Sequence, residues 1–184
     1  MRIIGGRWRG RRLASVGAGD PRAALRPTAD RVREALFNLL VNAHGDRVAG
    51  AAVLDAFAGT GALGLEALSR GAARATFVEN GRAGLALLRR NVALLEAEAR
   101  IVARDATRPG PGAPHDLVLL DPPYGRGLGA RALAALDAAG WIAPEATVAW
   151  EEAAPQDSPE GWEALDRRRY GETWITLLAR QARA

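Results

Sequence analysis

Cysteine is absent from the 184-residue chain, and histidine occurs only at His44 and His115. The absence of cysteine excludes disulfides, thiolate metal ligands and cysteine nucleophiles, and two isolated histidines argue against a histidine-based metal site or catalytic triad. We therefore expect a function that uses no metal ion. Both histidines are expected to lie in loops.

Long apolar runs are also missing, since none approaches the roughly 20 residues of a membrane span. Met1-Arg2-Ile3 opens no signal-peptide pattern. The composition, 48% hydrophobic and 25% charged, is ordinary for a soluble globular protein, and the length suits one well-cored domain with at most a small appendage. These features predict a cytoplasmic protein without membrane contact, and we expect a monomer.

Lysine is the third absence, because all 25 basic residues are arginine. This bias alone says little about nucleic acid, whereas the distribution of the arginines is informative. Residues 1–33 carry nine arginines and two aspartates, a local charge of +7, and the remainder carries 16 basic and 19 acidic residues, a charge of −3. A positive excess at one end of the chain is what contact with an anionic polymer requires.

Residues 1–25 form the first predicted segment. Arg2-Ile3-Ile4 and Trp8 to Leu13 flank Gly5-Gly6, a two-residue turn signal that predicts a small β-hairpin, and residues 14–25 indicate a flexible linker. A lone hairpin is marginally stable in water, so it must lean on the main domain or on a partner. A solvated basic arm is the alternative interpretation. The candidate RNA-binding residues are Arg2, Arg7, Trp8, Arg9, Arg11 and Arg12.

Residues 26–184 form the second predicted segment, which opens with a helix from Arg26 to about Asn42, capped by Thr28. The strands expected after it lie near 52–55, 75–79, 100–103, 116–121 and 147–151, with helices near 62–70, 82–97 and 128–139. This alternation predicts an α/β fold with a doubly wound, mostly parallel sheet. Residues 162–169 and 173–179 predict an antiparallel C-terminal hairpin, which brings the sheet to seven strands.

A strand, a glycine turn and a helix are indicated by Val53 to Gly64. Gly59 and Gly61 allow a tight turn, but their spacing with Gly64 also fits a dinucleotide-binding fingerprint. The glycines alone therefore do not distinguish NAD from other cofactors. Asp55 favours S-adenosylmethionine, because a carboxylate at this strand end attracts a cationic methionine portion and repels pyrophosphate. Glu79 is the expected acceptor for ribose hydroxyls. Asp105, with the Ala106 backbone nearby, is the expected acceptor for the adenine amino group.

Asp121-Pro122-Pro123-Tyr124 follows the apolar run Leu117 to Leu120, which predicts a buried strand that ends abruptly. A carboxylate and a proline carbonyl can accept both hydrogens of an exocyclic amino group while Tyr124 stacks on the attached ring. Asp121, Pro122, Pro123 and Tyr124 are therefore the candidate catalytic residues. A simple strand-ending turn is the alternative interpretation.

These motifs together resemble the class I S-adenosylmethionine-dependent methyltransferases. More narrowly, the chain resembles the bacterial 16S ribosomal RNA guanine N2-methyltransferase family. The resemblance is carried by Met1 to Arg11, Leu25 to Thr28, Asp30 to Asn38, Leu54 to Gly71 and Asp121 to Tyr124. It implies the class I, Rossmann-like fold, S-adenosylmethionine as cofactor, and 16S rRNA in the small ribosomal subunit or its assembly intermediate as partner.

The resemblance also implies that Arg26-Pro27-Thr28 belongs to the cofactor-side wall. One departure is that Asn80-Gly81-Arg82 follows Glu79, where the family usually has an acidic or polar residue and then aspartate. The candidate cofactor-binding residues are Arg26, Pro27, Thr28, Asp55, Phe57, Ala58, Gly59, Thr60, Gly61, Glu79, Asn80, Asp105 and Ala106.

The expected activity is methyl transfer to the N2 amino group of a guanine in 16S rRNA. An adenine-N6 or cytosine-N4 nucleic-acid methyltransferase uses the same acceptor geometry, a methyltransferase of protein side-chain amides is a third possibility, and an NAD-dependent oxidoreductase fits the glycine motif. A non-catalytic RNA-binding protein would keep the arginine-rich arm but has no use for Asp121 at a strand end. Deletion of residues 1–12 is expected to weaken RNA binding but not cofactor binding.

Overall fold

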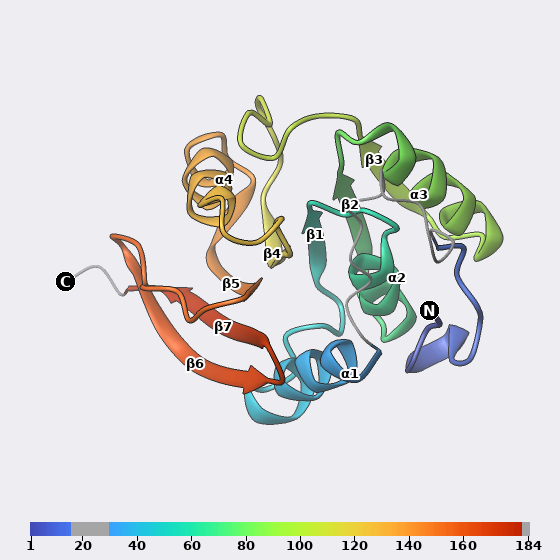
Figure 1. The fold of residues 1–184 in the computed structure, drawn as a ribbon, viewed down its shortest axis with the longest axis horizontal. Helices are drawn as coiled ribbons and strands as arrows, with labels where there is room; N and C mark the ends of the chain where they lie inside the picture. Colours follow the sequence, from blue (N-terminus) through green and yellow to red (C-terminus); the bar gives the residue numbers. More distant parts are fainter. Residues whose placement is uncertain (16–29, 182–184) are drawn as a thin grey trace.

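The computed structural model describes residues 1–15 and 30–181. Its centre is one seven-stranded sheet with the order β3-β2-β1-β4-β5-β7-β6 (Figure 1). The first five strands are parallel, and β7 runs antiparallel to both of its neighbours. The predicted doubly wound sheet with an antiparallel C-terminal hairpin is confirmed. The strands are β1 (Ala52–Ala56), β2 (Arg74–Val78), β3 (Ala99–Val102), β4 (His115–Leu120), β5 (Ile142–Glu152), β6 (Trp162–Tyr170) and β7 (Thr173–Arg180).

Helices cover both faces of the sheet, and a separate hydrophobic core lies between the sheet and the helices on each face. Strand residues such as Val53 and Phe77 share one core with the helices α1, α2 and α3, whereas Leu54 and Val78 share the other with α4. Successive strand residues point to opposite faces, so both faces of β1 and β2 are apolar. The helical elements are α1 (Asp30–Asn38), the π-helical turn η2 (Leu39–Ala43), α2 (Ala62–Ser69), α3 (Arg82–Leu94) and α4 (Leu128–Ala138).

The order of the strands reverses beside β1, which pairs with β2 on one side and with β4 on the other. In doubly wound sheets the crevice outside the carboxyl ends of the strands at such a reversal is the usual ligand site. The ends of β1 and β4 therefore place Asp55 and Asp121 beside the same crevice. Both fall where the sequence predicted them.

The N-terminal segment, residues 1–15, pairs with itself as predicted but turns elsewhere. Arg2 and Arg12 form an antiparallel bridge, and the Ile3 amide donates to the Arg11 carbonyl at 2.9 Å. The prediction that Gly5-Gly6 is the turn is wrong, because the chain reverses through the 3-10 turn η1 (Gly6–Trp8) and the residues after it. A Cβ at Gly6 would lie 1.7 Å from the Ser69 carbonyl oxygen, so this glycine permits close approach to α2.

Several predictions concern residues outside the described part of the chain. Arg26, Pro27 and Thr28, the start of the first helix, and the boundary between the two predicted segments all fall within residues 16–29. Where the chain is described, β5 begins at Ile142, five residues before the predicted start. Among the described residues, no helix combines the length and apolar character that a bilayer crossing needs.

Candidate active site

A cavity of about 1220 Å³ opens at the carboxyl ends of the parallel strands. An acidic residue at or just after the end of each of the five parallel strands lines it. These residues are Asp55, Glu79, Asp105, Asp121 and Glu151, from β1, β2, β3, β4 and β5 respectively. Glu172 lines the cavity as well, and so do Arg82, Arg104 and Arg126, so six carboxylates stand against three guanidinium groups. This excess of carboxylates suits a cationic ligand and disfavours a pyrophosphate.

The glycine turn between β1 and α2 forms one wall of this cavity, with Phe57, Ala58, Gly59 and Thr60 among its lining residues. Gly61 has φ of +80° and precedes α2, and a Cβ there would lie 2.5 Å from the side chain of Leu88. A side chain at this position would therefore be strained and would clash with α3. Phe57 to Thr60 therefore line the cavity, whereas Gly61 is not among the lining residues and faces Leu88 of α3 instead.

Asp55 is the most buried of the lining carboxylates, at 1% exposed. Its Oδ2 accepts a hydrogen bond from the Gly64 amide at 2.8 Å, which ties the end of β1 to the first turns of α2. Burial raises the pKa of Asp55 well above its usual range; the Gly64 bond opposes this shift, and the charges of Asp121 and Glu79 add to it. A bound cation would relieve both unfavourable contributions.

Glu79, directly after β2, holds the turns around the cavity. Its Oε2 accepts from the Gly59 amide at 2.7 Å, and its Oε1 accepts from the Gly81 amide at 2.5 Å. Each carboxylate oxygen has a second lone pair, so Glu79 can also accept from a ligand hydroxyl. A Cβ at Gly81 would lie 2.9 Å from Oε1, so glycine suits the departure from the family pattern after Glu79. Asn80 lines the cavity beside it.

Asp105 lies beyond β3 and is more exposed than Asp55. Its Oδ1 accepts from the backbone amide and the hydroxyl of Thr107, both at 2.8 Å. These hydrogen bonds, the backbone one first, lower the pKa of Asp105. Ala106 is buried and lines the cavity next to it. Asp105, the predicted acceptor for an adenine amino group, thus lines the cavity with its Oδ1 bonded to Thr107.

Asp121, Pro122, Pro123 and Tyr124 line the cavity beyond the end of β4. The Tyr124 hydroxyl donates to Glu151 Oε1 at 2.9 Å and lies 3.3 Å from the Thr173 hydroxyl oxygen. Burial is the main cause that raises the pKa of Tyr124, so the phenol stays protonated and able to donate. The aromatic ring is therefore held at the cavity wall by β5 and β7.

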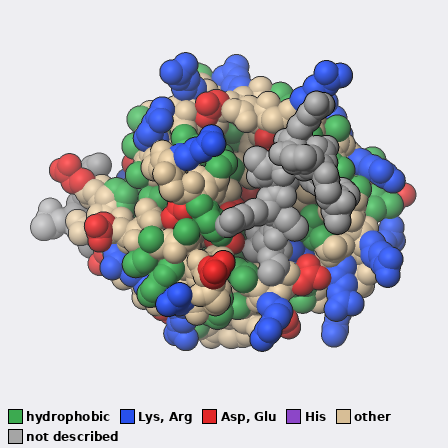
Figure 2. All heavy atoms as spheres, viewed as in Figure 1, with side chains coloured by type: hydrophobic (Ala, Val, Ile, Leu, Met, Phe, Trp, Pro, Cys, Tyr) green, Lys and Arg blue, Asp and Glu red, His purple; other side chains and the backbone are tan. Residues whose placement is uncertain are grey.

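The predicted RNA-binding arginines sit on a folded segment that leans on the main domain. Arg2, Arg7, Arg9, Arg11 and Arg12 are all exposed. Trp8 is half-buried against the core, and the Arg7 guanidinium stacks over its ring at 4.1 Å. Figure 2 shows arginine side chains around the outline of the molecule, several of them on the side where the N-terminal segment lies in Figure 1.

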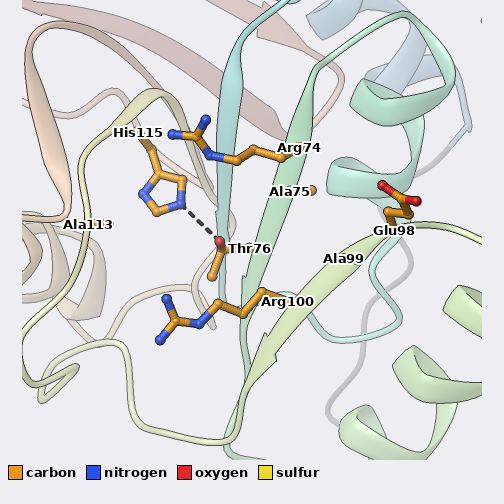
Figure 3. A pocket seen from close by; sticks show the side chains of 8 residues that line it. All are labelled: Arg74, Ala75, Thr76, Glu98, Ala99, Arg100, Ala113 and His115. Carbon is orange, nitrogen blue, oxygen red and sulfur yellow. Dashed lines mark hydrogen bonds between the residues drawn. The ribbon is translucent and has the colours of Figure 1, made fainter.

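His115 contradicts its predicted place in a loop. It begins β4 and is 3% exposed, and its Nε2 lies 2.9 Å from the Thr76 hydroxyl (Figure 3). Its Nδ1 lies 3.1 Å from the Trp141 carbonyl. Its ring stacks on Trp141, and burial lowers the pKa of the imidazole. The neighbouring cleft of about 290 Å³ is separate from the large cavity, since it lies at the amino ends of β2 and β4.

A family model described as conserved hypothetical protein 95 matches residues 1–179. The chain belongs to this family. It is 43% identical over 188 residues to the Escherichia coli (strain K12) protein named ribosomal RNA small subunit methyltransferase D, covering 99% of this chain and 91% of that protein. The family resemblance drawn from the sequence is thereby confirmed.

Solved structures share the fold of this member of the conserved hypothetical protein 95 family. The Escherichia coli protein yhhF has a TM-score of 0.84 at 42% identity, covering 100% of this chain and 99% of that one. A ribosomal protein L11 methylase from Lactobacillus delbrueckii subsp. bulgaricus has a TM-score of 0.65 at 14% identity, covering 82% and 79%. This second likeness concerns the fold alone, which is that of the class I methyltransferases.

Among the lining residues of this member of the conserved hypothetical protein 95 family that the sequence reasoning missed are Glu151, Thr173 and Met1. Glu151 is 5% exposed at the end of β5, Thr173 begins β7, and Met1 reaches the cavity from the N-terminal segment. The rule that selected Asp55 and Asp121, an acid at the carboxyl end of a predicted buried strand, would have selected Glu151 as well. No local pattern signals Met1 or Thr173.

Asp55→Asn is expected to stabilise the protein without cofactor at pH 7 and to weaken S-adenosylmethionine binding about tenfold or more. A raised pKa means that Asp55 contributes stability below its unfolded pKa of about 3.9, and that this contribution is lost as the pH rises through the folded pKa. The amide removes the buried charge and can still accept from Gly64. Thermal unfolding at pH 7 and pH 4 should show a higher midpoint for the variant at pH 7 only.

Asp105→Asn is the matched control for this pH dependence. The pKa of Asp105 is lowered, so its stabilising contribution is present above its unfolded pKa and is lost as the pH falls through the folded pKa. This variant should therefore lose a little stability at pH 7. An Asp55→Asn protein no more stable than the parent at pH 7 would contradict the proposed cost of this carboxylate.

Proposed function

We propose that the protein transfers a methyl group from S-adenosylmethionine to the exocyclic N2 amino group of a guanine in 16S rRNA of the small ribosomal subunit. The observation that carries this proposal is Asp121, with Pro122 beside it and Tyr124 held close by, at the edge of an acid-lined cavity. The name of the Escherichia coli relative, ribosomal RNA small subunit methyltransferase D, supports the choice of small-subunit rRNA.

The lining of the cavity fits S-adenosylmethionine. Asp55 attracts its cationic methionine portion, Glu79 accepts from its ribose hydroxyls, and Asp105 accepts from its adenine amino group. The backbone from Phe57 to Thr60 contributes one wall of the cavity, and Gly61, the next residue, packs against Leu88 of α3. When bound, S-adenosylmethionine supplies an electrophilic methyl group on a sulfonium sulfur. A dinucleotide is disfavoured, since its pyrophosphate would face the same carboxylates.

The target guanine enters the cavity after rotating out of its stack. Asp121 and the Pro122 carbonyl accept its two N2–H groups, which raises the electron density on a nitrogen otherwise conjugated with the ring. Tyr124 offers an aromatic face for stacking, and its bonds to Glu151 and Thr173 keep that face in one orientation. As the amino nitrogen forms the new N–C bond, the bond between the methyl carbon and the sulfonium sulfur breaks, and its electron pair stays on sulfur to give a neutral thioether. The nitrogen loses one proton, for which the Asp121 carboxylate is the adjacent acceptor.

The direct test uses methyl-labelled S-adenosylmethionine with small ribosomal subunits, bare ribosomal RNA and genomic DNA, all from cells lacking the enzyme. Digestion to nucleosides and chromatography identify the product. Label in N2-methylguanosine from the subunits is the expected result. Label in N6-methyladenine or N4-methylcytosine would overturn the choice of base, and label in no nucleic acid would overturn the proposed function.

Loss of exposed arginines from the N-terminal segment is expected to flatten the salt dependence of RNA binding. Each neutralised phosphate contributes about 0.7 to 0.9 to the log–log slope, so Arg9→Ala/Arg12→Ala should reduce the slope by roughly 1.4 to 1.8. Both side chains are exposed on the segment. The measurement is the affinity for small subunits between about 50 and 200 mM salt. Arg167→Ala/Arg169→Ala on the edge strand β6 removes the same charge and should leave the slope unchanged.

A further inference from the structure

The N-terminal segment is fixed to α2 through two polar side chains. Glu66, which is fully buried, accepts from the backbone amides of Ile4 and Gly5, both at 2.8 Å. Ser69, one turn later, accepts from the Trp8 amide at 2.9 Å and donates to the Gly5 carbonyl at 2.5 Å. α2 begins directly after the glycine turn, so the segment and the cofactor wall share one helix.

Both ends of the N-terminal segment also reach the cofactor cavity. Met1 and Ser15 are among its lining residues, together with Thr60 of the glycine turn. The Thr60 hydroxyl lies 3.8 Å from the Met1 sulfur, within reach of a weak hydrogen bond. The surface that carries the exposed arginines is therefore continuous with the wall of the cavity.

Asn91 of α3 joins the same two parts directly. Its amide nitrogen donates to the Ala14 carbonyl at 3.0 Å and to the Thr60 carbonyl at 2.9 Å, and its oxygen accepts from the Ala14 amide at 2.7 Å. Both N–H groups of the side chain are thus used, one on each part. Asn91 is fully buried, so water cannot replace these bonds without local opening.

We infer that Asn91 is a positioning residue that couples RNA binding at the N-terminal segment to cofactor binding at the glycine turn. The inference rests on the proposed function and goes beyond it, because it makes the two binding equilibria dependent on each other. A ligand that orders the glycine turn fixes the Thr60 carbonyl and, through Asn91, the backbone at Ala14. RNA then binds to a segment that is already ordered, which makes the coupling positive.

This coupling changes the expectation for a protein without residues 1–12. Charge alone indicates a loss of RNA affinity and no loss of cofactor affinity. The deletion also removes Met1 from the cavity wall and the backbone that docks on Glu66 and Ser69. We therefore expect the truncated protein to bind S-adenosylmethionine more weakly as well.

The test measures all four affinities of a thermodynamic cycle on the full chain. The affinity for small ribosomal subunits is measured with and without saturating S-adenosylhomocysteine, and the affinity for S-adenosylhomocysteine with and without subunits. For the unmodified protein we expect each ligand to strengthen the other about fivefold or more, by the same factor in both directions. Asn91→Asp, which replaces two donors by a carboxylate facing the two carbonyls, is expected to bring the factor close to one.

If Asn91 had a purely structural role, Asn91→Asp would weaken both affinities but leave the factor by which each ligand strengthens the other unchanged. This coupling factor is therefore the decisive readout. Asn42→Asp, an exposed asparagine on η2, gives the same change in charge and should keep the coupling. If Asn91→Asp does not fold, Ser69→Ala loosens the segment without touching Asn91 and should lower the factor. A coupling factor of one in the unmodified protein, or an undiminished factor in Asn91→Asp or Ser69→Ala, would overturn the inference. Subunits that are methylated without coupling would leave the proposed function standing.

Discussion

Asp121→Ala is expected to lower the turnover of methyl transfer about 10³-fold or more while S-adenosylmethionine still binds. The substitution removes the carboxylate that we propose accepts from the target amino group, and alanine offers no acceptor in its place. Cofactor binding should be nearly preserved, because the glycine turn, Asp55 and Glu79 remain in place. Single-turnover methylation of small subunits and calorimetric titration with S-adenosylmethionine measure the two effects separately.

Two further variants sharpen this prediction. Asp121→Asn keeps one acceptor oxygen but loses the charge, so its turnover should fall between that of Asp121→Ala and that of the unmodified protein. Asp157→Ala makes the same change at an exposed position between β5 and β6 and should leave turnover unaltered. Undiminished methylation by Asp121→Ala would rule out the proposed role of this residue.

Most of the fold follows from local signals in the sequence. The runs Ala52 to Leu54 and Leu117 to Leu120 are continuously apolar because both faces of β1 and β4 are buried, and such runs are readable without a structure. The acids that follow these runs were predicted for the same reason, since parallel strands bring their carboxyl ends to one edge. Asp55, Glu79, Asp105 and Asp121 all line one cavity as a result.

The structural features that the sequence did not indicate depend on contacts between residues that are far apart in the chain. Glu66 binds Ile4 across 62 positions, and Asn91 binds Ala14 across 77, so no periodicity connects them. Gly6 was taken for a turn residue because its need to approach Ser69 is visible only in three dimensions. His115 was placed in a loop because a single buried histidine at the start of a strand has no local signature. Burial of polar groups against distant partners is the part of this structure that local reasoning does not reach.

Glu66→Leu is expected to cost about 3 to 5 kcal/mol of the free energy of unfolding, because it breaks a buried ionic network on one side. Glu66 and Arg33 are both fully buried, and Arg33 Nε lies 3.6 Å from Glu66 Oε2. Arg70 Nε also donates to Glu66 at 2.7 Å. Leucine would leave the Arg33 guanidinium buried beside an apolar group and would deprive Ile4 and Gly5 of their acceptor. Urea unfolding at pH 7 gives the loss directly.

A double variant distinguishes the cost of leaving a buried charge unpaired from the cost of changing the packing of the side chains. Glu66→Leu/Arg33→Met removes both buried charges, and apolar replacement of a whole buried pair is often close to neutral, so it should be more stable than Glu66→Leu alone. Glu34→Leu on the exposed side of α1 makes the same change outside the network and should alter stability by no more than about 0.5 kcal/mol. Additive losses in the double variant would show that Glu66 and Arg33 act independently. A stabilised double variant that binds small subunits poorly would instead mean that this network holds the N-terminal segment in place for the proposed RNA contact, because Glu66 is also the acceptor for the backbone of that segment.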